Sequence, residues 1–465
     1  MNIRTRRIVR AIISHVWGPT GSVLLHILVV LLLVKLVTYS PPEKRMEYEV
    51  KYVEIIPPRL DYPPPDLPPA DFSPATVEAP VQPNLPSAEP PPDVQPDDWA
   101  KRPEEPFDIA MLNDIPSVLI IPDVYGTRTA EGRVNGRGSY AGGGYAETSV
   151  VKALEWLKKN QAPDGSWGPN KAAMTGLGLL TFLAHGETLS SEAYGQTVAK
   201  AVRFLIMQQD AGGQFHSTDG QAGPYVHAIA TYAVSEAYGM MRIPDLRPVM
   251  EKAVQVIVAG QQPGGGWDYR YAKGGRRDTS VAGWQIQALK AARIAGAETP
   301  GLRETFDLAA EDILGARDPE TGRFFYTDNS SHKTDSITAI AALCLQLMGR
   351  GDAREVQYAF RAMGGAGCDW DQPVEWPMYA WYYLTQAHFH HGGSVWSRWN
   401  AQFSRTLVRH QNEDGSWTSP GGQRGGAGKE THLGPVYSTT LAALSLQVYY
   451  RMLPTYKAVA LEPVT

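Results

Sequence analysis

The sequence has few cysteines and no excess of positive charge. Its 465 residues include 2 cysteines, too few for a disulfide framework or a cysteine-rich metal site. There are 43 lysines and arginines against 48 acidic residues, and the formal net charge is -5. Because no basic face is implied, nucleic acid is not an expected partner. The hydrophobic share of 43% is ordinary and allows a sizeable core.

Several sequence signatures of enzyme sites are also missing. The chain has no P-loop, no dinucleotide-binding fingerprint and no Gly-x-Ser-x-Gly elbow. Cys344 lies in an apolar helical run and is expected to be a buried, unreactive thiol. We therefore expect no cofactor and no metal ion.

The N-terminus has the pattern of a membrane anchor. Residues 1–21 carry four arginines and no acid, and residues 22–39 are an apolar stretch of about 18 residues. This predicts a single-pass helix in the inner (cytoplasmic) membrane, with the N-terminus in the cytoplasm and the C-terminal domain periplasmic. A cleaved signal peptide is the alternative, but Pro41 and Pro42 stand where cleavage would occur.

Two polar residues share one face of this predicted helix. Ser22 and His26 are four residues apart, and a histidine inside a membrane helix suggests a functional role. The stretch from Ser22 to His26, with its basic start and the proline-rich spacer after it, resembles the anchor of Ton-type energy transducers over residues 1–100. The resemblance implies a coupling face and proton-channel motor subunits as partners. A histidine with no coupling role is the alternative, and the C-terminal domain departs from that family.

A tether is predicted between the anchor and the large domain, over residues 40–147. About half of the 36 prolines fall between residues 41 and 107, which favours extended polyproline II over a folded core. A glycine-rich run at 132–144 ends this segment. We expect a disordered, extracytoplasmic tether.

The remainder of the chain repeats itself. The repeating unit is an amphipathic helix, a loop with glutamine, glycine and an aromatic residue, and a more apolar helix. The loop aromatics recur about every fifty residues, at Trp167, Phe215, Trp267, Phe324, Trp370 and Trp417. Such a period predicts a stacked helical array. The aromatic residues are expected to be structural, and the glutamine amides to bridge to backbone groups of the next repeat.

These loops resemble the Gln-Trp repeats of squalene–hopene cyclases and protein prenyltransferases. The resemblance covers residues 148–455 and leaves 456–465 as a tail. It implies an all-α fold, an α/α toroid of six helix pairs around a central cavity.

The chemistry of those enzymes is only partly matched. The cyclases protonate an alkene with the middle acid of an Asp-x-Asp-Asp motif, and here Arg277 stands at that place. Asp278 remains, as an expected helix N-cap, and Asp335 occupies the same place one repeat later. Asp369 and Asp371 form a second partial match. The zinc ligands of the prenyltransferases are absent as a set.

The sequence thus favours a membrane-anchored protein whose toroid binds a protein, lipid or glycan without catalysis, in a complex driven by the proton-motive force. The alternative is a terpenoid cyclase or prenyltransferase-type enzyme, for which Asp278, Asp335, Asp369 and Asp371 are the weak catalytic candidates.

Overall fold

The structure is a computed structural model that describes residues 123–140, 142–217, 223–328, 330–420 and 427–451. The chain divides into two compact units, Met1–Lys101 and Arg102–Thr465, and the described residues all belong to the second. They are helical, without a strand in those ranges, so the predicted all-α class is confirmed there. The predicted anchor at 22–39 lies outside the described residues. Among the helices that are described, none is long and apolar enough to cross a membrane.

Six apolar helices form an inner layer. Their residues are buried on almost every side; in the first of them, all residues from Ala172 to Ala184 are buried. Such helices are typical of a protein interior with neighbours all round. The six are α6 (Lys171–Ala184), α8 (Gly223–Met241), α10 (Thr279–Ala295), α12 (Asp335–Leu347), α14 (Pro377–His391) and α16 (Gly434–Leu446).

Six amphipathic helices form an outer layer, and each precedes an inner helix. In α7, for example, Val198, Val202 and Leu205 are buried while Gln196 and Lys200 are exposed, the spacing of a single apolar stripe. The outer helices are α5 (Gly144–Lys159), α7 (Gly195–Gln208), α9 (Leu246–Gly260), α11 (Leu302–Gly315), α13 (Arg354–Ala362) and α15 (Gly393–Arg409).

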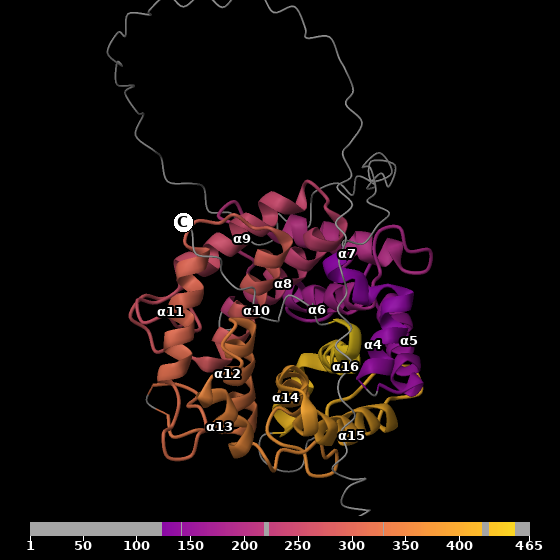
Figure 1. The fold of residues 1–465 in the computed structure, drawn as a ribbon. Coiled ribbons are helices and arrows are strands. Elements are labelled where there is room, and N and C mark those ends of the chain that lie inside the picture. Colours follow the sequence, from indigo (N-terminus) through magenta and orange to yellow (C-terminus); the bar gives the residue numbers. More distant parts are fainter. Residues whose placement is uncertain (1–122, 141, 218–222, 329, 421–426, 452–465) are drawn as a thin grey trace, which may run out of the picture. The chain divides into compact units, whose positions relative to one another are not determined.

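The helix pairs close into a ring. Each inner helix packs against the inner helices before and after it, and the last one, α16, returns to pack against α6. In the outer layer, α15 likewise meets α5. Figure 1 shows the yellow end of the described chain returning to the indigo end. This arrangement is a closed α/α toroid of six helix pairs.

The repeat loops join consecutive pairs through the glutamine amide. Gln161 Nε2 donates to Gly165 O in its own loop and to Thr197 O in the next outer helix, both at 3.0 Å. The same two bonds recur at Gln209, Gln261 and Gln411. Gln411 donates to Ser149 O at 2.8 Å, so this bond also links the last pair to the first. The predicted bridging role is confirmed.

The loop aromatics lie between helix ends, with one exception. Trp167, Trp267 and Trp417 are at most 1% exposed, and each indole donates to a carbonyl ten residues earlier, at 2.8 to 2.9 Å. Phe215 and Phe324 are fully buried. Trp370 differs: it is partly buried and stacks on His410, with ring centroids 4.5 Å apart.

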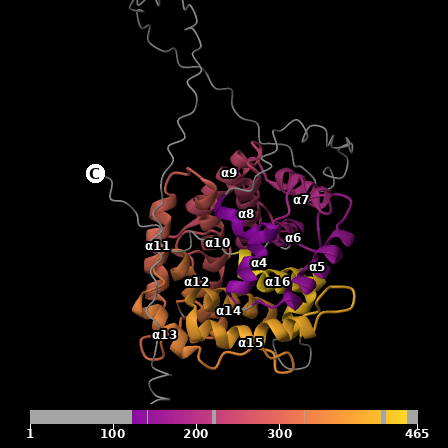
Figure 2. The same cartoon turned by 45° about the vertical axis from the view of Figure 1, so that its right-hand side comes forward.

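A short segment before the first helix pair covers the C-terminal ends of α6 and α8. It consists of η2 (Asp123–Arg128) and α4 (Ala130–Ser139), and it packs against α17 (Val448–Arg451) after the last pair. We call η2, α4 and α17 the plug; Figure 2 labels α4. The Arg128 guanidinium enters the ring and pairs with Glu236 of α8 at 2.7 Å.

The plug includes residues that the sequence assigns to the tether. Residues 123–128 and 130–139 are helical and contact α17, and α5 already begins at Gly144. The glycines explain why this segment looks like a tether in the sequence and yet is folded. A Cβ at Gly136 would lie 2.5 Å from Tyr449 O, and one at Gly142 would lie 2.8 Å from the Tyr449 ring. The glycine-rich run therefore allows close packing against α17.

Candidate functional site

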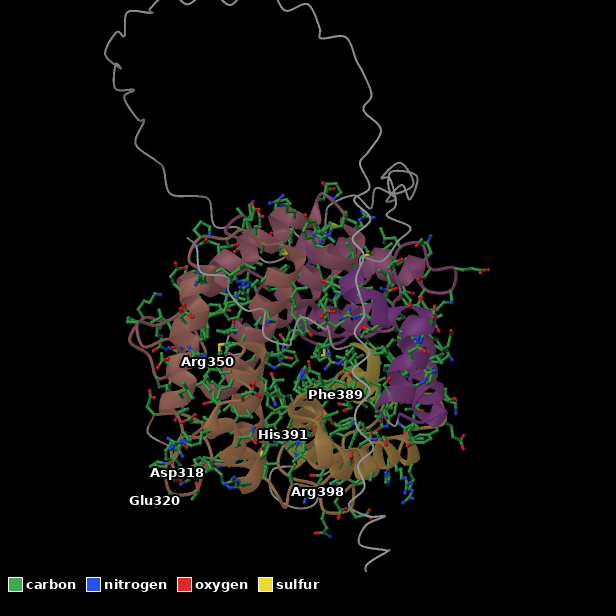
Figure 3. The ribbon with its side chains drawn as sticks, viewed as in Figure 1. Asp318, Glu320, Arg350, Phe389, His391 and Arg398 are labelled. Carbon is green, nitrogen blue, oxygen red and sulfur yellow. The ribbon has the colours of Figure 1, made fainter. Side chains whose placement is uncertain are left out.

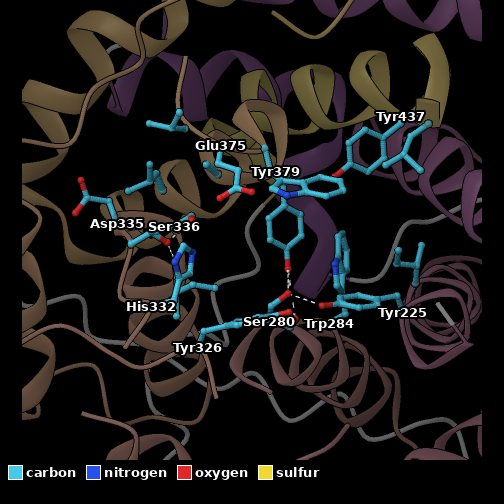
Figure 4. Close-up of a pocket in the computed structure, with 18 of the residues that line it drawn as sticks. Tyr225, Ser280, Trp284, Tyr326, His332, Asp335, Ser336, Glu375, Tyr379 and Tyr437 are labelled. Carbon is cyan, nitrogen blue, oxygen red and sulfur yellow. Dashed lines mark hydrogen bonds between the residues drawn. The ribbon is translucent and has the colours of Figure 1, made fainter. Parts of the chain in front are cut away.

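A cavity of about 910 Å³ lies at the N-terminal ends of the inner helices (Figure 4). The first turn of every inner helix contributes to its lining, through Ala173, Tyr225, Ser280, Ser336, Tyr379 and Tyr437. The six inner helices therefore run in the same direction and present their N-terminal ends to one space. The volume lies within the range of pockets that enclose small-molecule ligands.

The deep part of the cavity is apolar. Ile229, Trp284 and Leu384 follow the first-turn lining residues Tyr225, Ser280 and Tyr379 by four or five positions, which places them about 6 to 7.5 Å further along the helix axes. Trp284 stacks on Tyr382, with ring centroids 5.4 Å apart, so its ring is held in place. We call these three residues the floor.

The outer edge of the cavity is charged, and three of its charged side chains form ion pairs. Arg323 forms an ion pair with Asp335, and Lys333 Nζ lies 2.5 Å from Asp318 Oδ2. Figure 3 shows Asp318 on the periphery of the domain, in the loop that follows α11. Glu375 is an exposed acid on the same edge. We call Arg323, Lys333, Asp335 and Glu375 the rim.

Three hydroxyl groups lie between the rim and the floor. Tyr225 Oη is 2.5 Å from Ser280 Oγ, which is 2.9 Å from Tyr379 Oη. The Tyr379 hydroxyl also donates to Ser280 O at 3.3 Å. Figure 4 shows Tyr225 and Tyr379 approaching Ser280 from two sides. Burial raises the pKa of both phenols, so they stay protonated at neutral pH. We call these three residues the hydroxyl cluster.

Tyr379 is positioned by an acid that sequence reasoning missed. Glu430 is fully buried, and its carboxylate accepts the backbone N–H groups of Met378 at 3.0 Å and Tyr379 at 2.9 Å. Ser419 Oγ donates to the same carboxylate at 2.6 Å. The carboxylate thus occupies the N-terminal end of α14, where helix dipoles favour negative charge. The acid is 51 residues from Tyr379, so no local motif marks it.

Asp278 is the N-cap of α10. Its Oδ1 accepts the N–H groups of Ser280 and Val281, both at 3.0 Å. The residue is 1% exposed and does not line the cavity. Burial raises the pKa of Asp278, against the opposing effect of hydrogen bonds to Val281 and Tyr326. In this geometry the carboxylate starts the helix that carries Ser280 and Trp284.

Arg277 holds the place of the proton donor in the cyclase motif, and its contacts lie outside the cavity lining. Its Nε is 2.5 Å from Asp328 Oδ1 and 3.6 Å from Asp312 Oδ1. Burial raises the pKa of Asp312 to about 6, and the Arg277 charge opposes this rise. The contact between Arg277 and Asp312 joins the loop before α10 to the outer helix α11.

Asp335 does not cap α12, contrary to its expected similarity to Asp278. Thr334 is the N-cap, since its side chain accepts the N–H of Ile337 at 3.3 Å. Asp335 is the first helical residue and pairs with Arg323 at the rim. The threonine takes the cap because a hydroxyl one residue earlier reaches the third amide of the helix.

Asp369 and Asp371 lie away from the cavity lining. Both are exposed, and Asp369 Oδ1 accepts the N–H groups of Asp371 at 2.9 Å and Gln372 at 3.1 Å. Asp369 thus closes a local turn. Of the four catalytic candidates, only Asp335 touches the cavity.

The remaining residues of interest are the predicted coupling pair and the two cysteines. Ser22 and His26 lie outside the described residues. Cys344 and Cys368 are buried, and burial raises the pKa of both thiols. In the described ranges, no group of three or more histidine, cysteine, aspartate and glutamate residues could hold a metal ion.

The cavity residues themselves were not predicted as a site. The aromatic content of α14 is visible in the sequence, but a packed core would look the same. The usable signal is position: lining residues fall near the N-terminal end of an inner helix or in the loop that precedes it.

Comparison with known proteins finds structures and no family. No protein-family model and no curated protein sequence matches the chain. A protein from Actinoplanes has a TM-score of 0.47 at 14% identity, over 65% of this chain and 99% of that one. The GH76A alpha-1,6-mannanase from Salegentibacter sp. HEL1_6 has a TM-score of 0.48 at 10% identity, over 66% and 98%. The type II terpene cyclase MstE from Scytonema has a TM-score of 0.44 at 14% identity, over 65% and 98%. Likeness at this level carries no information on function.

Proposed function

We propose that the toroid is a binding domain for an amphiphilic, lipid-like molecule. The apolar part of this ligand occupies the floor, against Ile229, Trp284 and Leu384, and its polar part faces the rim. The observation that carries this proposal is the gradient along the helix axes. The floor residues one turn inside are apolar, and the charged lining residues all lie at or before the helix starts.

The proposal does not include cyclisation of the ligand. Alkene protonation needs a strong acid with access to the substrate. Asp278 is engaged as a helix N-cap outside the cavity lining, and Arg277 is bound to Asp328 and Asp312. Asp335 does reach the cavity, but as the partner of Arg323. These contacts support binding without turnover.

The test is displacement of a neutral apolar dye, N-phenyl-1-naphthylamine, from purified residues 102–465. This part is one compact unit with its own core, as expected of an independently folding domain. We expect saturable dye binding that dodecan-1-ol reverses. Ile229→Trp fills the floor and should weaken dye binding at least tenfold, because the cavity then lacks room. The matched control is Leu308→Trp, on the outer helix α11 at a position 44% exposed. Equal dye binding by the two variants would contradict the assignment.

The enzyme alternative has its own assay. Residues 102–465 are incubated with squalene or a prenyl diphosphate, and products are analysed by mass spectrometry. We expect no turnover. Turnover abolished by Asp278→Asn or Asp371→Asn would establish the alternative, since asparagine keeps capping ability and removes only the acid.

We further propose that the toroid is held at the periplasmic side of the inner membrane by a helix at 22–39. The face with Ser22 and His26 would contact proton-channel motor subunits. The basic N-terminus and the Ser-x-x-x-His spacing support this. The full chain should co-purify with channel subunits from membranes, and His26→Ala should remove them. Absence of any such partner in the wild type would refute the coupling.

A further inference from the structure

The hydroxyl cluster stands at the neck of the cavity, where the polar rim gives way to the apolar floor. Ser280 is the second residue of α10, and Trp284 of the floor lies one turn further along the same helix. Tyr225 and Tyr379 are each the third residue of their helices, α8 and α14. A ligand with its hydrocarbon part on the floor would pass these three hydroxyls with the atoms that begin its polar end.

The hydrogen bonds within the cluster determine whether its hydroxyls can still donate to a ligand or accept from it. Three hydroxyls supply three protons and six acceptor lone pairs. A carbonyl can only accept, so Tyr379 donates to Ser280 O. If each hydroxyl donates once, Ser280 Oγ then donates to Tyr379 Oη, and Tyr225 donates to Ser280 Oγ. This arrangement satisfies the three contacts and uses every proton. It leaves acceptor lone pairs on all three oxygens and no proton to donate.

The surroundings keep this acceptor surface uncharged. Both phenols stay protonated, and among the rim charges Arg323 is paired with Asp335 and Lys333 with Asp318. A second tyrosine pair, Tyr269 and Tyr326, lines the same wall with their hydroxyls hydrogen-bonded together. The neck is thus suited to a neutral donor, such as an alcohol, rather than to an ion.

We infer that the hydroxyl cluster of Tyr225, Ser280 and Tyr379 selects ligands with a neutral hydroxyl group at the head of a hydrocarbon tail. The ligand class is therefore a long-chain alcohol. The hydroxyl donates to the cluster, and the tail lies on the floor. An ether of the same shape has no proton to donate and leaves the acceptors unpaired. This inference rests on the proposed binding function and adds the chemistry of the head group.

The experiment compares two probes that differ in one donor. Dodecan-1-ol and 1-methoxydodecane each compete with N-phenyl-1-naphthylamine for residues 102–465 and, as a second sample, for the full chain. One neutral hydrogen bond contributes about 1 kcal/mol, so the alcohol should bind about fivefold more tightly than the ether. The double variant Tyr225→Phe/Tyr379→Phe should reduce this ratio to about one, and because both probes are measured on the same variant, a general change in affinity cancels from the ratio.

A matched control removes a phenol elsewhere. Tyr194 donates to Glu155 at 2.7 Å, away from the cavity lining, and Tyr194→Phe should keep the wild-type ratio. Ser280→Ala, which removes the shared hydroxyl without changing a ring, should reduce the ratio as the double variant does. This second variant keeps the test decisive if the double variant folds poorly.

The outcomes separate the two claims. If neither probe nor dye binds the wild type, the binding function fails and this inference fails with it. If both probes bind equally well, or if the variants keep the wild-type ratio, the selection of a hydroxyl is wrong while the binding function stands. Displacement of the dye by methyl glucoside at similar concentrations would assign the cavity to glycans and overturn the alcohol class.

Discussion

The two ends of the inner helix ring follow the same electrostatic rule, but the cavity described above lies at one of them and the plug at the other. At the N-terminal ends, acids meet the helix dipoles: Asp278 caps α10 and Glu430 binds the first amides of α14. At the C-terminal ends, a positively charged side chain meets the helix dipoles. Arg128 donates hydrogen bonds to Leu183 O of α6 at 3.4 Å and to Arg451 O of α17 at 2.9 Å. At the N-terminal ends the acids bind amides around the cavity, whereas at the C-terminal ends the Arg128 side chain of the plug lies among the helix ends.

The difference shows how a toroid can be stable and still have room for a ligand. At the plug end, Arg128 and Glu236 form a buried pair with both side chains 2% exposed. At the cavity end, the corresponding ion pair of Arg323 and Asp335 is about a third exposed. Buried pairs are costly to break, while exposed pairs contribute little. We therefore expect stability to depend mainly on the plug and binding mainly on the cavity.

The largest effect is expected from Arg128→Ala. This change leaves Glu236 buried without its partner and should lower the free energy of unfolding by about 3–5 kcal/mol. The measurement is urea unfolding of residues 102–465. The double variant Arg128→Met/Glu236→Leu should recover most of the loss, since no charge is left buried.

The rim supplies the matched control for this prediction. Arg323→Gln should cost no more than about 1 kcal/mol, because its ion pair is partly exposed to water. Equal losses for Arg128→Ala and Arg323→Gln would show that the two ends do not differ in their contribution to stability.

A medium effect is expected from pH beside the plug, where Glu147 of α5 contacts Arg137 and Tyr450. Burial alone would raise the pKa of Glu147, but His185, Arg137 and Tyr450 together lower it to about 2. The ordinary value is 4.5, so this stabilisation is present above about pH 4.5 and is lost as the pH falls toward 2. With allowance for solvent screening, it amounts to about 2 kcal/mol.

His185 acts in the opposite pH range. Burial would lower its pKa, but Glu147 and Glu187 raise it above 6.5. Its stabilisation is complete below the ordinary value and is lost as the pH rises through the raised one. The urea midpoint should therefore be measured across pH. Its dependence on pH in the acidic range should be lost in Glu147→Gln, and its dependence on pH near neutrality should be lost in His185→Gln. Unchanged profiles would show that this cluster does not control stability.

The smallest effect is expected from Asp278. Asp278→Asn keeps the cap and should change stability by less than about 0.5 kcal/mol, whereas Asp278→Ala should cost about 1–2 kcal/mol. The pH dependence has the opposite sign to that of Glu147: burial raises the pKa of Asp278, so its contribution falls as pH rises above 3.8. A free energy of unfolding that is several kcal/mol lower in Asp278→Asn would refute a pure capping role.

The helix pairs and their joints could be predicted because their signals are local. Gln161, Gly165 and Trp167 fall within seven residues, and each contributes by hydrogen bonding or turn geometry that needs only the next repeat. The ring closure through Gln411 follows the same pattern. Its partner Ser149 belongs to α5, which is the next outer helix for the last repeat loop.

The plug and the cavity could not be predicted, for two physical reasons. The glycines at 136 and 142 contact Tyr449, about 300 residues away, so their run looks like a linker in the sequence. The inner helices are buried on nearly all sides, and their apolar pattern therefore has no preferred face. Which residue faces the ring axis is decided by packing, and Trp284 could not be distinguished from its buried neighbours.

The most direct test of the account is to locate a bound amphiphile by cross-linking. Dodecan-1-ol with a photoactivatable diazirine at the far end of its tail is irradiated with residues 102–465, and the modified residues are mapped by mass spectrometry. The account predicts labels on the floor, at Ile229, Trp284 and Leu384, and their loss in the presence of excess dodecan-1-ol. Labels confined to the plug, or spread over exposed positions such as Val134 and Met207 without competition, would contradict it.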